Sequence, residues 1–596
     1  MISSKVMTSE FDFGNYETYK EREGAVMAEI KRISIGIESY KEIVDKQYYY
    51  IDKTLFIKAL LDKGGKVNLF TRPRRFGKTL ALSMLRTFFE KDSDLQGNVT
   101  DNCHYFAGKK IMEAGESYTR HMGQYPVISL SLKSAKQPNF EMAYGQLVEE
   151  ILREFERHQY VLDGDKLSER AIEIYGNILT GKAADVEYAT ALKFLSECLK
   201  KYHGKNVIVL IDEYDVPLEN AYFRGFYDKM IDFIRSLFES VLKTNENLEF
   251  AVVTGCLRIS KESIFTGLNN LEIISLLTID YAEYFGFTLL EVEKMLEDYG
   301  ISEKKEEAKS WYNGYLFGNT EVYNPWSVIN YVKAAIADIR ALPRPYWSNT
   351  SSNSIVRHLI EKADDDAKEE IELLIQGETI EKTVHEDITY EDIYKTQENL
   401  WNFLFFTGYL KKVKERMEEE NIILTMEIPN REVRYIFKNT IREWFDSRIR
   451  MRDLSGLFEG ILKGDAEQIQ QELSPILLES VSYMGSYENF YHGFLLGILT
   501  NLNGYKLTSN REAGDGRYDI SLESRDGLKD PVILEFKIGK RRPDLMKKAE
   551  EALQQIVEKR YDTPFIEEEY EQCIHVGIGF VRKMCRVKCE TVRYEL

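Results

Sequence analysis

Apolar runs and amphipathic stretches alternate along the first half of the 596-residue chain. Four short runs are rich in apolar residues and predict strands, at 66–70, 125–130, 207–211 and 250–254. Helical periodicity fills much of the sequence between them. Strands that alternate with helices predict a parallel sheet covered on both faces, so the expected fold class of this half is α/β.

The pattern becomes mainly helical beyond residue 280. Asn324 and Pro325 are typical of a helix start, because Asn caps the first turn and Pro fits the first helical position. Residues 361–450 are acidic and helix-rich, with a few short strands such as 422–426. We interpret this part as a helical lid followed by a winged-helix-like module.

A mixed pattern returns near the C-terminal end of the chain. A helical stretch at 468–500 precedes two strands, at 518–522 and 532–537. A helix at 544–559 and a strand at 574–580 follow. This order predicts a small α/β domain with a core of its own.

The chain is too long for a single hydrophobic core, so we expect several domains. The predicted segments are an N-terminal extension at 1–30, an α/β domain at 31–280, a helical lid at 281–360, a helical and winged-helix-like linker at 361–480, and the C-terminal α/β domain at 481–596.

The composition is typical of soluble globular protein. Hydrophobic residues make up 43% and charged residues 30%, and no apolar run reaches the roughly 20 residues that span a bilayer. The first 30 residues lack a basic segment followed by an apolar stretch, so no secretory signal is expected. Six cysteines are too few for a disulfide framework and fit a reducing compartment. We therefore expect a cytoplasmic protein without a membrane segment.

A formal net charge of -19 argues against a protein that coats nucleic acid non-specifically, because phosphate binding needs a positive surface. Nucleic-acid contact would require a local basic patch. The clearest patch lies at 531–548 and contains Lys537, Lys540, Arg541, Arg542, Lys547 and Lys548. A solvated helix face is the alternative explanation of such a patch.

Residues 71–79, with the sequence Thr-Arg-Pro-Arg-Arg-Phe-Gly-Lys-Thr, follow the first strand and precede a helix. The end of this segment matches a phosphate-binding loop, in which Lys78 neutralises the outer phosphates and Thr79 binds Mg²⁺. Arg72 stands where such loops carry glycine, which suggests a different loop curvature or phosphate approach. We assign nucleotide contacts to Arg74, Arg75, Phe76, Gly77, Lys78 and Thr79.

An acidic pair, Asp212 and Glu213, directly follows the wholly apolar third strand. Asp212 can hold the Mg²⁺ shell, while Glu213 orients and deprotonates the attacking water. Thr254, at the end of the next strand, is expected to face the γ-phosphate or the attacking water. Arg258 is expected to stabilise the charge that develops on the phosphate. A helix-capping turn is the alternative for residues 77–79 alone, but the acidic pair favours a nucleotide site.

Three segments resemble the bacterial AAA-ATPase-like family: 71–79, 210–215 (Leu-Ile-Asp-Glu-Tyr-Asp) and 254–260 (Thr-Gly-Cys-Leu-Arg-Ile-Ser). The similarity continues through 312–315 and 323–327 and covers half to two-thirds of the chain. Members of that family carry Arg in place of the first glycine of the loop, as this chain does. The resemblance implies a P-loop NTPase sheet with ATP and Mg²⁺ as cofactors.

A second constellation lies in the C-terminal domain. Asp519 belongs to one predicted strand and Glu535 and Lys537 to the next, where the last two point to the same face. Two carboxylates that hold one or two Mg²⁺ ions, with a lysine that positions water or stabilises charge, suit phosphodiester hydrolysis. Alternating charges on a solvated sheet face are the alternative explanation.

This spacing resembles the PD-(D/E)XK nuclease superfamily. The resemblance implies a restriction-endonuclease-like fold, a further metal ligand from an earlier helix at Glu488, and accessory polar residues at Gln555 and Tyr561. Residues 510–519 also resemble the version of this domain that is fused to an AAA-ATPase-like module. The basic residues 540–542 follow the central strand, where they could line a groove for a phosphate backbone.

Together these patterns predict an ATP-binding and ATP-hydrolysing protein whose nucleotide state controls a Mg²⁺-dependent nuclease acting on DNA or RNA, with DNA favoured. A role in defence against mobile DNA fits by analogy with bacterial fusions. The alternative is a nucleotide-operated switch or scaffold whose C-terminal domain binds nucleic acid or protein without cutting. The sequence leaves the polynucleotide, the trigger and the choice between monomer and homo-oligomer open.

Overall fold

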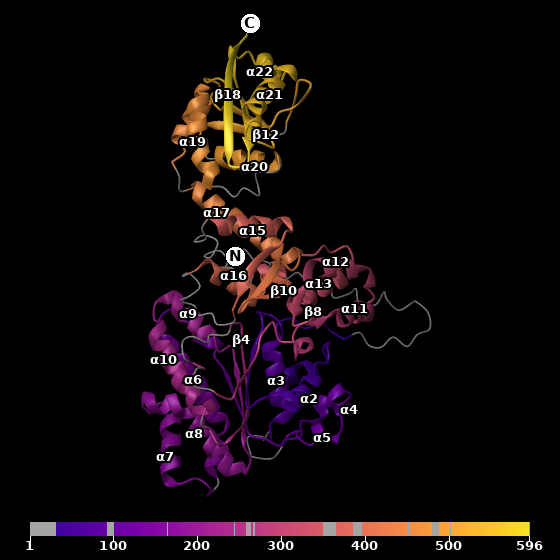
Figure 1. Cartoon of the computed structure of the whole chain (residues 1–596), viewed down its shortest axis with the longest axis vertical. Helices are drawn as coiled ribbons and strands as arrows, with labels where there is room; N and C mark the ends of the chain where they lie inside the picture. Colours follow the sequence, from indigo (N-terminus) through magenta and orange to yellow (C-terminus); the bar gives the residue numbers. More distant parts are fainter. Residues whose placement is uncertain are drawn as a thin grey trace, which may run out of the picture.

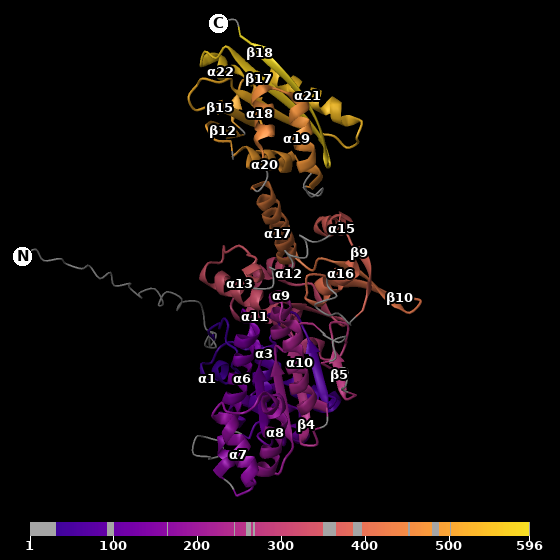
Figure 2. The same ribbon diagram turned by 90° about the vertical axis from the view of Figure 1, so that its left-hand side faces the viewer.

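The computed structural model of the protein describes most of the chain. The described residues are 31–91, 100–163, 165–243, 245–257, 264–265, 269–349, 365–385, 396–450, 453–479, 488–500, 502–509 and 511–594. An α/β domain, a helical middle part and a smaller C-terminal domain follow one another along the long axis (Figures 1 and 2).

The first domain is built on a five-stranded sheet. Its strands are β1 (Val67–Thr71), β2 (Val127–Ser131), β3 (Val207–Asp212), β4 (Leu248–Gly255) and β5 (Leu271–Ile274). Their order is β2-β3-β4-β1-β5, and all neighbours are parallel. β1 and β3 are buried at every position, as strands covered on both faces must be. The predicted parallel sheet is confirmed, with β5 as an additional edge strand.

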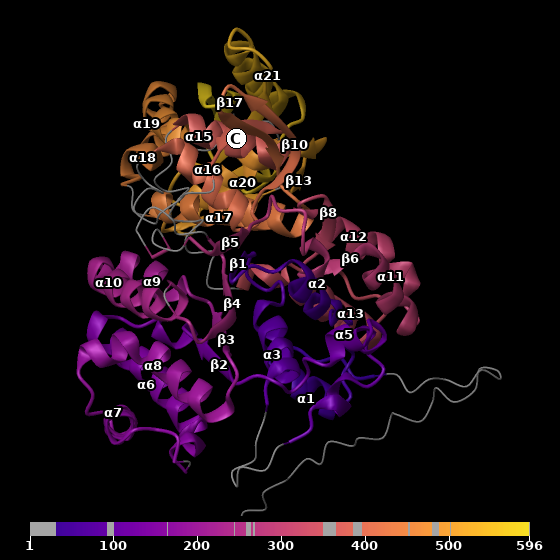
Figure 3. The ribbon, with the colours of Figure 1, turned by 60° about the horizontal axis from the view of Figure 1, so that its bottom comes forward.

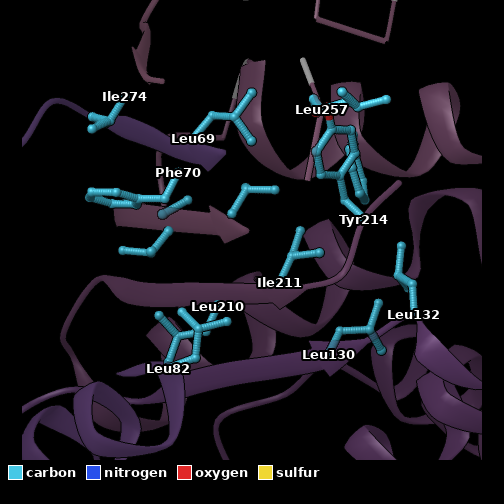
Figure 4. Packing of buried hydrophobic residues seen from close by; sticks show 14 of the residues in the cluster. Leu69, Phe70, Leu82, Leu130, Leu132, Leu210, Ile211, Tyr214, Leu257 and Ile274 are labelled. Atoms are coloured by element: carbon cyan, nitrogen blue, oxygen red, sulfur yellow. The ribbon is translucent and has the colours of Figure 1, made fainter. Parts of the chain in front are cut away.

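Helices cover both faces of this sheet (Figure 3). On one side lie α2 (Leu55–Lys63) and α3 (Lys78–Phe89), and on the other α6 (Phe140–Arg157), α8 (Asp185–His203) and α10 (Tyr227–Phe238). The domain also contains α1 (Tyr40–Asp45), α4 (Lys110–Glu113), α5 (Glu116–Thr119), α7 (Glu169–Leu179) and α9 (Val216–Arg224). Strands and helices share one buried cluster, in which Figure 4 shows Leu69, Leu130 and Leu210 from three of the strands.

The segment predicted as a helical lid combines helices with a small antiparallel sheet. Its helices are α11 (Leu289–Asp298), α12 (Lys305–Tyr312) and α13 (Pro325–Ala337). Its strands β6 (Phe287–Thr288), β7 (Tyr315–Phe317) and β8 (Thr320–Tyr323) pair in the order β6-β8-β7. The Asn324 side chain accepts the Ser327 N–H at 3.3 Å and Pro325 begins α13, so the predicted helix start is confirmed.

A helix-strand-helix-hairpin unit follows. It consists of α15 (Asp365–Gln376), β9 (Ile380–Val384), α16 (Gln397–Phe406), β10 (Lys411–Glu418) and β11 (Asn421–Glu427). The strands pair antiparallel in the order β10-β11-β9, which gives the winged-helix-like arrangement that was expected. Its buried residues belong to the same cluster as the parallel sheet, so this unit packs on the first domain.

The long helix α17 (Arg431–Arg450) leads from this unit toward the C-terminal domain (Figure 2). That domain has its own sheet of β12 (Tyr505–Ser509), β15 (Ile520–Ser524), β16 (Val532–Ile538), β17 (Gln572–Val581) and β18 (Met584–Arg593), in this order. β16 and β17 are parallel and the other neighbours are antiparallel. The helix α21 (Asp544–Glu558) forms the crossover that a parallel pair requires. The remaining elements are the short pair β13 (Glu512–Ala513) and β14 (Gly516–Arg517), and α22 (Thr563–Glu567).

The C-terminal domain has buried clusters of its own, of which the larger extends from Leu454 to Val587. Three helices contribute to it, α18 (Ser455–Lys463), α19 (Ala466–Glu479) and α20 (Glu488–Leu499). Because α18 and α19 bury their apolar residues against this sheet, we propose that the domain begins near residue 453.

Two general features complete the description. No helix in the described part of the chain is both long and apolar enough to cross a membrane. All six cysteines are free thiols.

Candidate functional sites

The loop between β1 and α3 carries the candidate nucleotide motif. Gly77 caps α3 with a φ of 84°, and Arg75 has a φ of 73°. The Lys78 ammonium group donates to the carbonyl oxygens of Arg72 at 2.9 Å and Pro73 at 3.0 Å. The loop therefore curls around the Lys78 amine at the N-terminus of a helix, where backbone N–H groups attract anions.

The Arg72 side chain points away from this loop. It is fully buried, and its Nη1 donates to the carbonyl oxygens of Ile274 at 3.0 Å and Ser275 at 2.7 Å. The guanidinium carbon lies 5.4 Å from the ring centre of Phe285 and 5.1 Å from that of Phe317. Burial lowers the pKa of Arg72 to about 9. The arginine at this position therefore anchors the end of β5 and does not enter the loop.

Three of the predicted residues meet at the carboxyl edge of the sheet. Asp212 ends β3, and its Oδ2 accepts the Thr79 hydroxyl at 2.7 Å. Its other carboxylate oxygen accepts the hydroxyl of Thr254 in β4. These side chains come together because β3 and β4 are neighbours and β4 lies beside β1, whose loop leads to Thr79.

Two further carboxylates lie beside this group. Glu213 has a φ of 51° and lines the same cavity as Lys78, and burial raises its pKa. Asp215 is buried and accepts the backbone N–H groups of Cys256 at 2.7 Å and Leu257 at 3.1 Å. Burial also raises the pKa of Asp215. Sequence reasoning did not identify Asp215 as a site residue, although it lies two positions beyond the acidic pair.

A cavity of about 390 Å³ opens beside the loop. Residues 74–79 and Glu213 form part of its lining, and the aromatic and aliphatic side chains of Tyr50, Trp326 and Ile329 form another part. A lining that combines charged with apolar groups suits the phosphates and the base of a nucleotide.

The other residues assigned to this site lie as follows. Arg74 forms an ion pair with Glu219 of α9. Phe76 is buried, with its ring centre 4.9 Å from that of Tyr315 in the lid. Arg258 lies outside the described residues.

The C-terminal domain brings Asp519, Glu535 and Lys537 together. Asp519 precedes β15, and its carboxylate accepts the N–H of Phe536 in β16 at 2.8 Å. The Glu535 carboxylate accepts the Asp519 N–H at 3.2 Å and the Lys537 ammonium group at 3.2 Å. These bonds bring the three residues together, with Asp519 just before β15 and not inside a strand as expected.

Accessory residues reach this group from neighbouring elements. The Gln555 amide, on α21, donates to Glu535 at 2.6 Å and to the Tyr561 hydroxyl at 2.9 Å. The His492 ring, on α20, contacts the carbonyl oxygen of Asp519 through Nε2 at 2.9 Å. Glu488 begins α20, but its side chain lies outside what the structure describes.

Comparison with known families agrees with this geometry. Residues 34–265 match the family described as Predicted AAA-ATPase, and residues 486–590 match the PD-(D/E)XK nuclease superfamily. The chain joins an AAA-ATPase-like domain to a PD-(D/E)XK nuclease-like domain. The first match contains both Lys78 and Asp212, and the second contains the complete acid and lysine group.

A curated protein of similar sequence occurs in Azotobacter chroococcum mcd 1 and is described as an uncharacterized protein in the vnfD 5' region. It is 28% identical over 335 residues, which covers 55% of this chain and 56% of that protein. The chain therefore spans just over half the length of the curated relative it matches.

The electrostatics of the PD-(D/E)XK domain fit a divalent cation. Burial, and then the charge of Asp519, raise the pKa of Glu535 to about 7, while Lys537 acts in the opposite direction. A divalent cation would relieve the repulsion between the two carboxylates. Among the described residues, no group of three His, Cys, Asp or Glu side chains is arranged to hold a metal, so the described protein ligands at this site would be these two acids.

The basic patch of the PD-(D/E)XK domain lies where β16 leads into α21. The backbone N–H groups of Lys540 and Arg541 donate to the Asp544 carboxylate at 3.2 and 2.9 Å, which fixes the turn. Arg541 and Arg542 are exposed. The patch therefore presents cations beside β16, the strand that carries Glu535 and Lys537.

Proposed function

We propose that the AAA-ATPase-like domain binds and hydrolyses ATP with Mg²⁺, and that the PD-(D/E)XK domain cleaves nucleic acid with a divalent metal. The observation that carries this proposal is the presence of two complete polar groups in separate domains. They are Lys78, Thr79, Asp212 and Glu213 in the first, and Asp519, Glu535, Lys537 and Gln555 in the second.

In the nucleotide cavity, Lys78 exchanges the loop carbonyls for the outer phosphates. Thr79 and Asp212, which share a hydrogen bond, would hold Mg²⁺. A bound Mg²⁺ would supply positive charge that offsets the charge of the phosphates. Glu213 orients and deprotonates the attacking water, a role that its raised pKa suits. Thr254 holds the second oxygen of Asp212 in place.

In the nuclease site, Asp519 and Glu535 would hold the divalent metal, joined by Glu488 at the start of α20. A metal at this position supplies charge that activates water and stabilises the phosphate. Lys537 donates to Glu535 and positions the water or stabilises the phosphate charge in the transition state. Gln555, on α21, donates a hydrogen bond to the Glu535 carboxylate and so holds it in place.

By analogy with bacterial nuclease fusions, the substrate we favour is DNA rather than RNA. It would approach through residues 540–542, because the net charge of -19 leaves few basic surfaces for a phosphate backbone. The free thiols fit a reducing compartment, so we propose that the protein acts in the cytoplasm. Defence against mobile DNA is the role that analogy favours.

The test is to incubate the purified full-length protein with DNA or RNA, with Mg²⁺ or Mn²⁺, and with or without ATP. We expect Lys537→Ala to abolish cleavage and to leave ATP hydrolysis intact. Lys78→Ala should abolish ATP hydrolysis and change the dependence of cleavage on ATP. Lys463→Ala and Lys294→Ala, at exposed lysines with partners in their own helices, serve as matched controls.

The results separate two classes of function. Cleavage that needs Lys537 supports a nuclease, and a change caused by Lys78→Ala supports control by nucleotide. ATP hydrolysis without cleavage under any metal would instead favour a nucleotide-operated switch or scaffold that binds nucleic acid or protein.

A further inference from the structure

Two asparagine-containing segments of the lid form hydrogen bonds with the start of α17. They have the sequences Tyr-Asn-Gly-Tyr, at 312–315, and Tyr-Asn-Pro-Trp-Ser, at 323–327. Asn430 precedes α17 and accepts the N–H of Val433 at 3.0 Å, as an N-cap residue does. Its amide also donates to the carbonyl oxygen of Asn313 at 2.7 Å. The cap of α17 is therefore bonded to the first of these segments.

Glu432, in the first turn of α17, is bonded to the second segment. It is fully buried, and its carboxylate accepts the Ser327 hydroxyl at 2.8 Å and the Trp347 N–H at 2.8 Å. Gly314 has a φ of 95°, and a Cβ there would lie 2.2 Å from the carbonyl oxygen of Pro429. A buried carboxylate costs free energy unless its hydrogen bonds are kept, so these contacts hold the first turn of α17 in one position.

Trp326, the neighbour of Ser327, faces the nucleotide cavity. The Arg75 guanidinium carbon lies 4.2 Å from the Trp326 ring centre, and both residues line the cavity with Lys78. Trp326 and Ser327 are consecutive residues in the first turn of α13. One helix turn therefore contacts both the phosphate loop and the start of α17.

Arg75 has two competing partners when a nucleotide binds. In the structure its guanidinium stacks on Trp326, whereas a phosphate would offer a charge-assisted hydrogen bond. If Arg75 turns to the phosphate, Trp326 loses this contact and the first turn of α13 is held differently. The empty and filled cavities thus differ in contacts, which any shift driven by a ligand requires.

We propose that Trp326, Ser327 and Glu432 couple the nucleotide cavity to α17, so that nucleotide binding shifts the helix that leads to the PD-(D/E)XK domain. This proposal rests on the proposed nucleotide binding and does not require nuclease activity. Ser327 and Glu432 act as positioning residues, because neither lines the cavity.

Hydrogen exchange of the full-length protein, read by mass spectrometry, tests this coupling with ADP or a non-hydrolysable ATP analogue. In the wild type, nucleotide should slow exchange at 74–80 and change exchange at 431–440 by about threefold or more. Ser327→Ala and Glu432→Leu should keep the first response and lose the second. The two variants change opposite partners of the same hydrogen bond. If one of them fails to fold, the other still tests the coupling.

Two controls accompany these variants. Glu432→Gln should keep both responses, because its amide can donate to Ser327 and accept the Trp347 N–H. Ser310→Ala removes a hydroxyl that bonds within α12 and should also keep both.

Three results would overturn the coupling. Protection of 74–80 in the wild type with unchanged exchange at 431–440 would refute it and leave nucleotide binding standing. A response of α17 that persists in both Ser327→Ala and Glu432→Leu would refute the assigned residues. Absence of any protection at 74–80 would refute nucleotide binding together with the coupling.

Discussion

Arg72 and Glu432 are buried ionisable side chains whose hydrogen-bond partners in the described part of the chain are carbonyl, hydroxyl and N–H groups. Burial lowers the pKa of Arg72 to about 9 and raises the pKa of Glu432 to about 8. Both residues tie together segments that are distant in sequence. At the scale of single residues, stability should therefore depend on them more than on exposed ion pairs.

Replacing Arg72 by glycine, the usual residue of phosphate loops at this position, should destabilise the protein. The change removes the bonds to the carbonyls of Ile274 and Ser275 and leaves a cavity beside Phe285 and Phe317. Deletions of this kind cost roughly 2–5 kcal/mol. Arg72→Met keeps most of the volume without the buried charge and should cost less. Urea unfolding measures both; a glycine variant as stable as the wild type would contradict the anchoring role.

The raised pKa of Glu432 makes stability depend on pH. An unfolded glutamate releases its proton near the ordinary pKa of 4.5, whereas the folded protein keeps it up to about pH 8. The folded state binds more protons between these values, so stability falls as pH rises through this window, by an amount on the order of 3–5 kcal/mol. Glu432→Gln cannot titrate, and should gain stability relative to the wild type between pH 5 and pH 8. Urea midpoints at both pH values check this, and a constant difference between the two proteins would rule it out.

At the scale of elements, strong local patterns made some parts of the fold predictable. The four predicted strands of the parallel sheet are rich in apolar residues because both faces are covered. β5 and the three lid strands were not predicted, because they are short, and β5 is only half-buried along most of its length. Their pairing depends on partners that sequence periodicity does not reveal.

The site could be predicted to a similar extent. The contacts of Asp212 with Thr79 and Thr254 follow from residues that end or follow neighbouring parallel strands. The hydrogen bond from the Cys256 N–H to Asp215 was not predictable. An aspartate at this position is as typical of an exposed helix start as of a buried site residue. Burial in three dimensions gives that residue its role.

Close packing of β17 on α21 depends on Gly579. A Cβ there would lie 2.2 Å from the carbonyl oxygen of Leu545 and 2.7 Å from the N atom of Ala549. Gly579→Ala should destabilise the C-terminal domain by roughly 3 kcal/mol or more, since helix and strand must separate. Gly497→Ala, at an exposed helical position where an added Cβ would meet nothing within 4 Å, should stay within about 1 kcal/mol of the wild type.

The tryptophans provide the measurement for this pair of variants. All five precede residue 451, so tryptophan fluorescence follows the first domain and its attached units, whereas circular dichroism follows the whole chain. Gly579→Ala should lower the midpoint of the unfolding transition that circular dichroism detects and tryptophan fluorescence does not. A parallel shift of both signals would contradict local packing as the cause.

At the scale of the whole molecule, the buried clusters of the C-terminal domain share no residue with the cluster of the first domain, which predicts two cooperative units. A fragment of residues 453–596 should unfold cooperatively by itself. A fragment of residues 481–596 lacks Leu457 and Ile469, which are buried in the larger C-terminal cluster, and should be less stable. Thermal unfolding of both fragments tests the proposed domain start, and equal midpoints would place it back near residue 481.

α17 is an uninterrupted helix of 20 residues, about 30 Å long, between the two units. Each residue inserted into such a rod would lengthen it by about 1.5 Å and rotate everything beyond it by about 100°. Two full turns, or seven residues, nearly restore the original facing. Relatives in which this spacer varies in length should therefore differ by close to seven residues wherever the orientation of the distal domain matters.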